Sequence, residues 1–84
     1  MNLVFTSEGW EEYEYWQKND TKTLRKINEL IKACTRDPFE GIGKPEPLKG
    51  ELQGFWSRRI TGEHRLVYQI SEDGLQIIQC RFHY

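Results

Sequence analysis

A short strand-like run precedes the first helical pattern of the chain. Residues 2–6, NLVFT, are rich in β-branched and aromatic side chains, which is typical of a strand. Trp10, Tyr13 and Trp16 then recur every three residues, so they lie along one side of a helix that Ser7 can cap. These aromatic side chains either enter the core or contact another protein chain.

The second helix has a regular apolar stripe. Its apolar positions are Leu24, Ile27, Leu30, Ile31 and Cys34. Their spacing of three and four residues places them on one face of a helix. Asp20 or Thr21 can cap this helix, and Pro38 ends it. The two patterns together predict a helical hairpin over about residues 8–36.

A long loop and a series of strands follow the hairpin. Residues 37–53 hold all three prolines and several glycines, which indicates a loop of restricted backbone geometry, and a loop of this length is often functional. Alternating apolar and polar residues then predict strands at 54–61, 64–70 and 75–82. The expected fold is α+β, in the order β-α-α-β-β-β. Two helices pack on one face of a twisted, mainly antiparallel sheet of four or five strands.

Strand alternation separates a core face from an open face. The positions expected in the core are Trp56, Ile60, Leu66, Tyr68, Ile70, Ile78, Cys80 and Phe82. The open face is expected to carry Ser57, Arg59, Arg65, Val67, Gln69, Gln79, Arg81 and His83. Arg58 shares a face with Trp56, so we expect its head at the sheet edge. His64 begins a strand on the core side, where a structural histidine is expected.

Composition and length bound the class of protein. The 84 residues make a single domain, 1–84, and their content of 37% hydrophobic and 30% charged residues is typical of a globular chain. We see neither a secretory signal nor an apolar run of membrane-spanning length, so we expect a cytoplasmic protein without a membrane partner. Cys34 and Cys80 lack metal or disulfide spacing and are expected as buried thiols, with a disulfide or a metal role as the alternative. No cofactor or metal site is predicted.

The charges are unevenly distributed along the chain. Residues 1–16 carry four glutamates and no lysine or arginine. In residues 44–65 the basic side chains, Lys44, Lys49, Arg58, Arg59 and Arg65, outnumber the acidic ones. A polyanion would be attracted to the second stretch, although a solvated mixed surface explains the charges equally well.

The open face brings together groups that suit cleavage of RNA without a metal. Glu46 or a histidine could take the proton of a ribose 2′-hydroxyl, and His83 could protonate the departing 5′ oxygen, because histidine is a common general acid near neutral pH. Arginine guanidinium groups, such as that of Arg65, match the charge that grows on the phosphoryl oxygens. Tyr84, which follows His83 in the chain, adds a hydroxyl group to this set. Lys44 and Lys49 could hold flanking phosphates.

Each of these residues also has a plainer interpretation. An arginine on an exposed strand face usually points to solvent, and a histidine near a chain end usually has no role. From the residues alone, two functions therefore stay open: an endoribonuclease and an inactive ribosome- or RNA-binding module.

Several motifs resemble a known family. GKPEPLKG, GFWSRRIT, EHRLVY and the closing CRFHY, together with YWQKND and KINELIKACTRDPFEG, resemble the YoeB (Txe) toxins of the RelE/ParE superfamily over nearly the whole chain. The resemblance implies a RelE-like fold, similar to that of microbial ribonucleases. It also implies a type II toxin that cleaves mRNA in the ribosomal A site and so inhibits translation. The alternative that the resemblance leaves open is a toxin that inhibits a target such as a topoisomerase by docking alone, as relatives of this fold do.

The resemblance also implies roles and partners. Glu46 would be the general base, Arg65 would stabilise the phosphorane, His83 would be the general acid and Tyr84 would support orientation. The positions expected to bind RNA are Lys44, Lys49, Arg59 and Arg81. The implied partners are mRNA with the ribosome and its 16S rRNA, an antitoxin of the YefM/Phd type and a second copy of the chain.

Two positions depart from the family pattern. Phe82 stands where a tyrosine is expected, and strand parity points it into the core, so we expect the missing hydroxyl to matter little. Gly62 replaces an acidic or polar residue and fits a tight turn.

Overall fold

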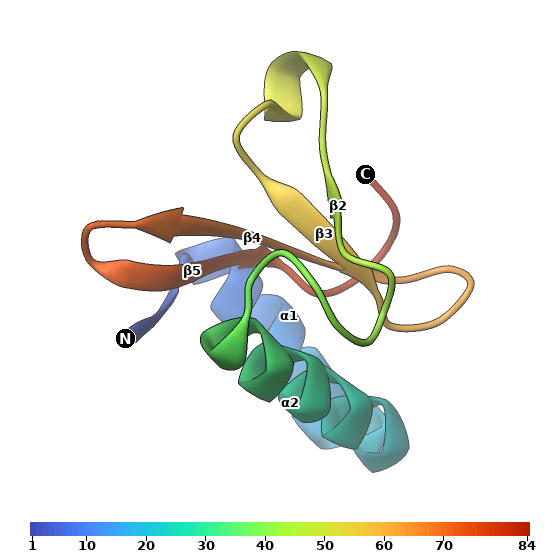
Figure 1. Cartoon of the computed structure of the whole chain (residues 1–84). Helices are drawn as coiled ribbons and strands as arrows, with labels where there is room; N and C mark the ends of the chain where they lie inside the picture. The colour runs from blue at the N-terminus through green and yellow to red at the C-terminus, as the bar shows by residue number, and fades with distance from the viewer.

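Two helices and a five-stranded sheet make up the fold in the computed structural model, which describes all residues 1–84 (Figure 1). The elements are β1 (Leu3–Phe5), α1 (Ser7–Asn19), α2 (Thr21–Arg36), β2 (Glu46–Pro47), a 3-10 turn η1 (Gly50–Leu52), β3 (Trp56–Arg59), β4 (Arg65–Ser71) and β5 (Gly74–Gln79). The strand order is β1-β5-β4-β3-β2, with β1 parallel to β5 and the other pairs antiparallel. The predicted α+β fold is confirmed, and the short β2 supplies the fifth strand.

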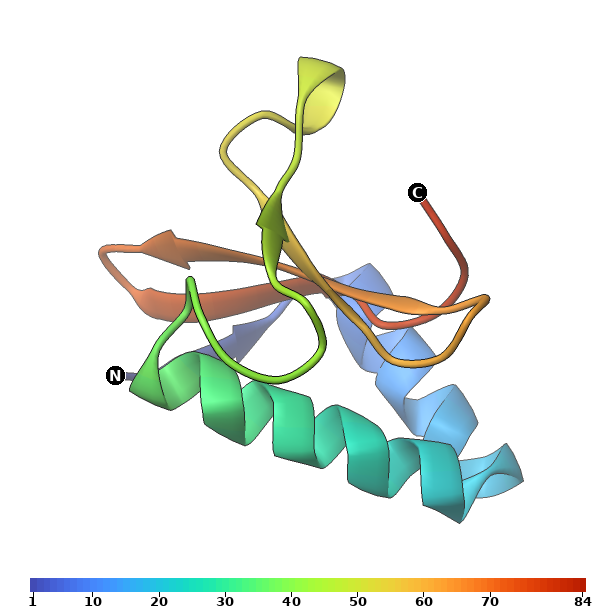
Figure 2. The ribbon, with the colours of Figure 1, turned by 45° about the vertical axis from the view of Figure 1, so that its right-hand side comes forward.

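Both helices cover one side of the sheet, and the C-terminal end of the chain lies on the other side (Figure 2). β2 forms the edge of the sheet beside β3. The core between the layers consists of Trp16, Ile27, Leu30, Ile31, Cys34, Ile60, Leu66, Tyr68, Leu75, Ile77 and Cys80. Gly9 lets α1 approach β5 closely, because a Cβ atom at this position would lie 2.6 Å from the carbonyl oxygen of Ile77.

The predicted N-cap of α2 is confirmed, and that of α1 is wrong by one residue. Asp20 caps α2, because its carboxylate accepts the backbone N–H of Thr23, and this bond lowers the pKa of Asp20. The predicted cap of α1, Ser7, is wrong by one residue. Thr6 takes that place, and its hydroxyl accepts the backbone N–H of Gly9.

The predicted core face of the last strand is partly wrong. Val67 pairs with Gln79 while Tyr68 pairs with Ile77, so Ile78 is an extra residue in a β-bulge. The bulge changes the parity of β5, and Ile77 rather than Ile78 is fully buried.

The strand also ends earlier than expected. It stops at Gln79, and Phe82, which was expected in the core, is 55% exposed. On the neighbouring strand, Ile70 is also exposed rather than in the core.

Arg58 is fully buried, so the prediction that its head lies at the sheet edge is wrong. Its guanidinium donates hydrogen bonds to the carbonyl oxygens of Asp37, Glu40 and Ile42 and to the hydroxyl of Tyr68. Burial of this charge is tolerated because each of its three guanidinium nitrogens donates at least one hydrogen bond. The bonds tie the loop after α2 to the sheet.

Candidate active site

A row of paired residues crosses the face of the sheet opposite the helices. Glu46 on β2 pairs with Ser57 on β3, Ser57 pairs with Val67 on β4, and Val67 pairs with Gln79 on β5. Directly paired residues of antiparallel strands point to the same face. The next row, which holds Trp56, Tyr68 and Ile77, faces the helices, so the row with Glu46 faces away from them.

The chain end folds back onto this row. The hydroxyl of Tyr84 donates a hydrogen bond to Oε1 of Glu46 at 3.2 Å and lies 3.1 Å from the hydroxyl of Ser57. In Figure 1 the C-terminus lies near β2 and β3, on the side away from the helices. Two residues separated by 38 positions thus form one site, with Ser57 between them. Ser57 is only 1% exposed, so this part of the open face is covered.

His83 precedes Tyr84 in the chain, and Arg65 contacts the backbone of Phe82 just before it. His83 is exposed, with its Nδ1 atom 3.1 Å from the carbonyl oxygen of Tyr84. The backbone N–H of Arg65 donates to the carbonyl oxygen of Phe82 at 3.0 Å, which places Arg65 beside the segment that carries His83. Hydrogen bonds from the Arg65 guanidinium to Thr61, Gly62 and His64 carbonyl oxygens all use Nη1. Arg65 is only 9% exposed, and these bonds hold its guanidinium against the turn between β3 and β4.

The other basic residues divide into two groups. Arg59 is exposed and pairs directly with Arg65, so two guanidinium groups share this face. Lys44 and Lys49 are exposed on either side of Glu46 in the chain. Arg81 is different, because its guanidinium carbon lies 3.4 Å from the ring centroid of Tyr15 on α1. The prediction that Arg81 lies on the open face is wrong, because the chain leaves the strand geometry after the bulge.

The loop that carries Glu46 is held at both ends. Before β2, the carbonyl oxygen of Gly43 accepts the backbone N–H of Arg59 at 2.7 Å. After β2, the backbone N–H of Leu48 donates to Phe55 at 2.9 Å, and the Leu48 side chain is buried. Together with the hydrogen bonds of Arg58, these contacts fix the backbone on both sides of Glu46.

Groups with shifted pKa values lie outside this site. Burial raises the pKa of Glu12, although its carboxylate accepts the backbone N–H of Cys80. Burial, together with the nearby Glu12 charge, raises the pKa of Cys80 to about 12. Burial also raises the pKa of the Cys34 thiol and raises that of Tyr68 to about 12. Both cysteines are free and buried, as expected.

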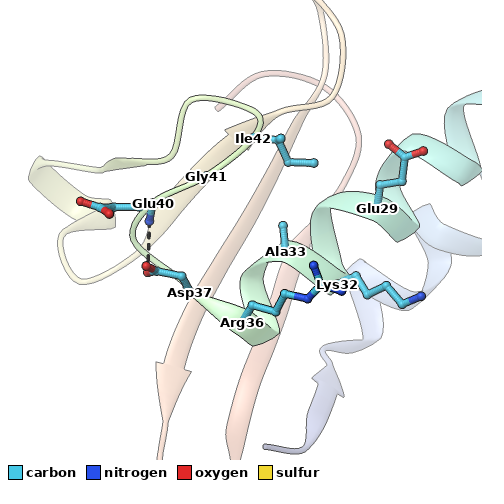
Figure 3. Close-up of a pocket in the computed structure, with 8 residues that line it drawn as sticks. All are labelled: Glu29, Lys32, Ala33, Arg36, Asp37, Glu40, Gly41 and Ile42. Atoms are coloured by element: carbon cyan, nitrogen blue, oxygen red, sulfur yellow. Dashed lines mark hydrogen bonds between the residues drawn. The ribbon is translucent and has the colours of Figure 1, made fainter.

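A groove between α2 and the loop after it lies away from the site (Figure 3). Its lining residues are Glu29, Lys32, Ala33, Arg36, Asp37, Glu40, Gly41 and Ile42. The backbone N–H of Glu40 donates to the Asp37 carboxylate there. None of the expected catalytic residues lines this groove.

Two further results concern metals and membranes. No three His, Cys, Asp or Glu side chains come together in a way that could hold a metal ion. Neither helix has the length and apolar character needed to cross a bilayer.

Sequence reasoning missed two residues that contact the site. Ser57 was expected on the open face but without a role, because the pairing of β3 with the two-residue β2 has no clear sequence signal. His64 was expected to be structural, and its ring does pack against Trp16. Its bond to the chain end, from the backbone N–H of Phe82 to Nδ1, was not foreseen.

Known proteins share both the sequence and the structure. The family described as "YoeB-like toxin of bacterial type II toxin-antitoxin system" matches residues 5–84. Toxin YoeB of Escherichia coli strain K12 is 60% identical, and the match covers all of both chains.

Solved structures give the same result. A YoeB/ParE toxin from Agrobacterium tumefaciens is 57% identical over the whole of both chains, with a TM-score of 0.96. A protein from Staphylococcus aureus has been solved as a YoeB dimer, which is 48% identical with a TM-score of 0.92. This match covers 100% of this chain and 98% of that chain. A YoeB–YefM complex from the same organism is 47% identical with a TM-score of 0.91 and the same coverage.

Proposed function

Because the chain belongs to the YoeB-like toxins of bacterial type II toxin–antitoxin systems, we propose that it is a ribosome-dependent endoribonuclease. Its substrate is mRNA in the ribosomal A site, and cleavage there blocks translation. The observation that carries this proposal is the hydrogen bond between the Tyr84 hydroxyl and the Glu46 carboxylate. This bond places the chain end, with its histidine, beside an acidic group in a cationic surrounding.

The proposed reaction is a transesterification. Glu46 takes the proton of the ribose 2′-hydroxyl, and the 2′ oxygen forms a bond to phosphorus as the bond to the 5′ oxygen breaks. His83 gives its proton to the departing 5′ oxygen. The products are a 2′,3′-cyclic phosphate, or the 3′-phosphate that its hydrolysis gives, and a 5′-hydroxyl. Arg65 donates hydrogen bonds to the phosphoryl oxygens as their charge grows.

Tyr84 and Ser57 orient the base in this scheme. If the Tyr84 hydroxyl donates to Glu46, the Ser57 hydroxyl donates in turn to Tyr84, and the chain of bonds fixes one carboxylate oxygen. The other oxygen is then directed toward the substrate. Charge stabilisation comes from guanidinium groups, so the step as written requires no metal and no cofactor.

Basic residues around the site bind the RNA backbone in the proposal. Arg59 lies beside Arg65 on the same face, and Lys44 and Lys49 are exposed on the loop around Glu46. All three side chains can reach phosphates that flank the scissile bond. The position of Arg81 against Tyr15 gives no support for a contact with RNA at this site.

Two protein partners are proposed for this chain. Structures of the Staphylococcus aureus relative as a dimer and as a complex with YefM support a homodimer and an antitoxin of the YefM/Phd type. The cationic face would attract an acidic segment of such an antitoxin. Activity on translating ribosomes places the protein in the cytoplasm.

The test is in vitro translation followed by mapping of mRNA 5′ ends. We expect wild-type protein to produce new 5′ ends within codons at the A site, and His83→Gln or Glu46→Gln protein to produce none while still binding ribosomes. Arg25→Gln on the exposed surface of α2 is the control and should cleave like the wild type. Intact mRNA with the wild-type protein would instead favour a toxin that acts by docking alone.

A further inference from the structure

We propose that His64 is a positioning residue of the site, which acts through the backbone of Phe82 to fix where His83 and Tyr84 lie. This inference rests on the proposed function for its catalytic consequence. The contact itself is independent of that function, since it is a property of the folded chain.

A short hydrogen bond carries the inference. The backbone N–H of Phe82 donates to Nδ1 of His64 at 2.7 Å. A peptide N–H can only donate, so Nδ1 must be unprotonated and the ring proton must be on Nε2. A histidine that binds in this way is neutral, and it is poised to hold a backbone segment rather than to exchange a proton with substrate.

The ring of His64 is itself fixed by the core. It packs edge-on against Trp16, with 4.9 Å between the ring centroids. The indole N–H of Trp16 donates to the carbonyl oxygen of Cys80 at 2.8 Å. The turn between Cys80 and Phe82 is therefore held by two side chains that contact each other, one from α1 and one from the residue before β4.

Phe82 needs such support because its backbone is in an unfavourable region. Its φ angle is +65°, which an aromatic residue rarely adopts, and its side chain is 55% exposed. Both backbone groups of Phe82, the N–H and the carbonyl oxygen, are hydrogen-bonded. His64 accepts its N–H, while its carbonyl oxygen accepts the backbone N–H of Arg65 at 3.0 Å and the Gln79 side-chain amide at 3.1 Å. The next residue in the chain is His83.

The hydrogen bonds to Phe82 also link the proposed acid, His83, to the proposed phosphate-binding residue, Arg65. His64 and Arg65 are consecutive, and both hold Phe82. Without the hydrogen bond to His64, the backbone N–H of Phe82 has no partner in the chain, and His83 and Tyr84 can move relative to Arg65. Since displacement of a catalytic group by about 1 Å can lower a rate by about 100-fold, this contact governs the rate more than the stability of the fold.

Three variants test the proposal. In His64→Asn the side-chain oxygen takes the place of Nδ1 and can accept the same N–H. In His64→Gln the oxygen lies one carbon farther out, and His64→Ala has no acceptor. On ribosomes programmed with a mapped mRNA, we expect the Ala and Gln variants to lower kcat by about 10- to 100-fold while KM stays within about twofold. The Asn variant should recover most of the rate.

A second measurement does not depend on activity. In 15N relaxation experiments, the order parameters of the His83 and Tyr84 amides should fall in the Ala and Gln variants and recover in the Asn variant. Full kcat in the Ala variant, or equal defects in the Asn and Gln variants, would overturn the proposal. If wild-type protein cleaves nothing, the proposed function fails, and unchanged order parameters in the Ala variant would then overturn the positioning role separately.

Discussion

Replacement of Arg58 by methionine should destabilise the protein severely, whereas the same replacement of the exposed Arg59 beside it should leave the stability of the fold almost unchanged. The Arg58 side chain is fully buried and donates to three loop carbonyl oxygens and to the hydroxyl of Tyr68. Methionine matches the arginine side chain only as far as Nε and has no donor. The variant therefore keeps the packing of the stem and removes all four hydrogen bonds.

The magnitude follows from those bonds. Each hydrogen bond to a charged group contributes about 1.5–3 kcal/mol. The three carbonyl groups belong to Asp37, Glu40 and Ile42, whose side chains are exposed, so water can replace part of the loss when the loop opens. We therefore expect a net loss of about 3–5 kcal/mol in the free energy of unfolding. A domain of this size has about 4–13 kcal/mol in total.

Urea unfolding, followed by tryptophan fluorescence, measures the effect. With a slope of about 1–1.5 kcal/mol per M, the midpoint should fall by about 2–5 M urea. Arg58→Lys keeps the charge but cannot donate to all four acceptors. Its midpoint should therefore lie between those of the wild type and Arg58→Met. Arg59→Met is the matched control on the exposed neighbour and should change stability by about 0.5 kcal/mol or less. A midpoint for Arg58→Met within about 0.5 M of the wild type would refute this account of the loop anchor.

Three further predictions follow from single contacts. Gly9→Ala should destabilise the fold by about 1–3 kcal/mol in urea unfolding, because its Cβ would meet Ile77; unchanged stability would contradict the close approach. Tyr84→Phe should keep the melting temperature but lower kcat about 10-fold, since it frees Glu46; full activity would contradict this orienting role. Cys80, with its pKa raised to about 12, should resist iodoacetamide at about pH 8 until urea is added. Because the unfolded thiol has its ordinary pKa of 9.0, the free energy of unfolding should fall as the pH rises from about 9 toward 12, and a flat profile would contradict the raised pKa of Cys80.

Periodic patterns located the regular elements well. The stripe Leu24, Ile27, Leu30, Ile31 and Cys34 lies on the buried side of α2, because a 3.6-residue repeat depends only on local geometry. The same logic failed on β5, where the bulge at Ile78 shifts the parity by one residue. A bulge depends on how two strands pair, and the residues of one strand do not reveal it.

Charged residues were harder to place than apolar ones. Strand parity put Arg58 on the core face, but its burial depends on carbonyl groups of a loop some 20 residues away, which no pattern shows. Arg81 lies against Tyr15 because the chain turns after Gln79.

Long-range contacts of the candidate site were predictable only in part. The approach of Tyr84 to Glu46 was expected from the resemblance and from the chemistry of the two groups. The contacts of Ser57 and His64 with the chain end were not, because they depend on the register of β2 and on the turn at Phe82.

The central claim is that the 2′-hydroxyl at the scissile position attacks the phosphate when the chain end and Glu46 act on it together. The most direct test uses ribosome-bound mRNA with a single 2′-deoxyribose on the 5′ side of the mapped scissile bond. We predict that cleavage at this bond disappears, while the same mRNA with the deoxyribose one nucleotide away is still cut and leaves a 5′-hydroxyl. Undiminished cleavage at the deoxy position would contradict the account.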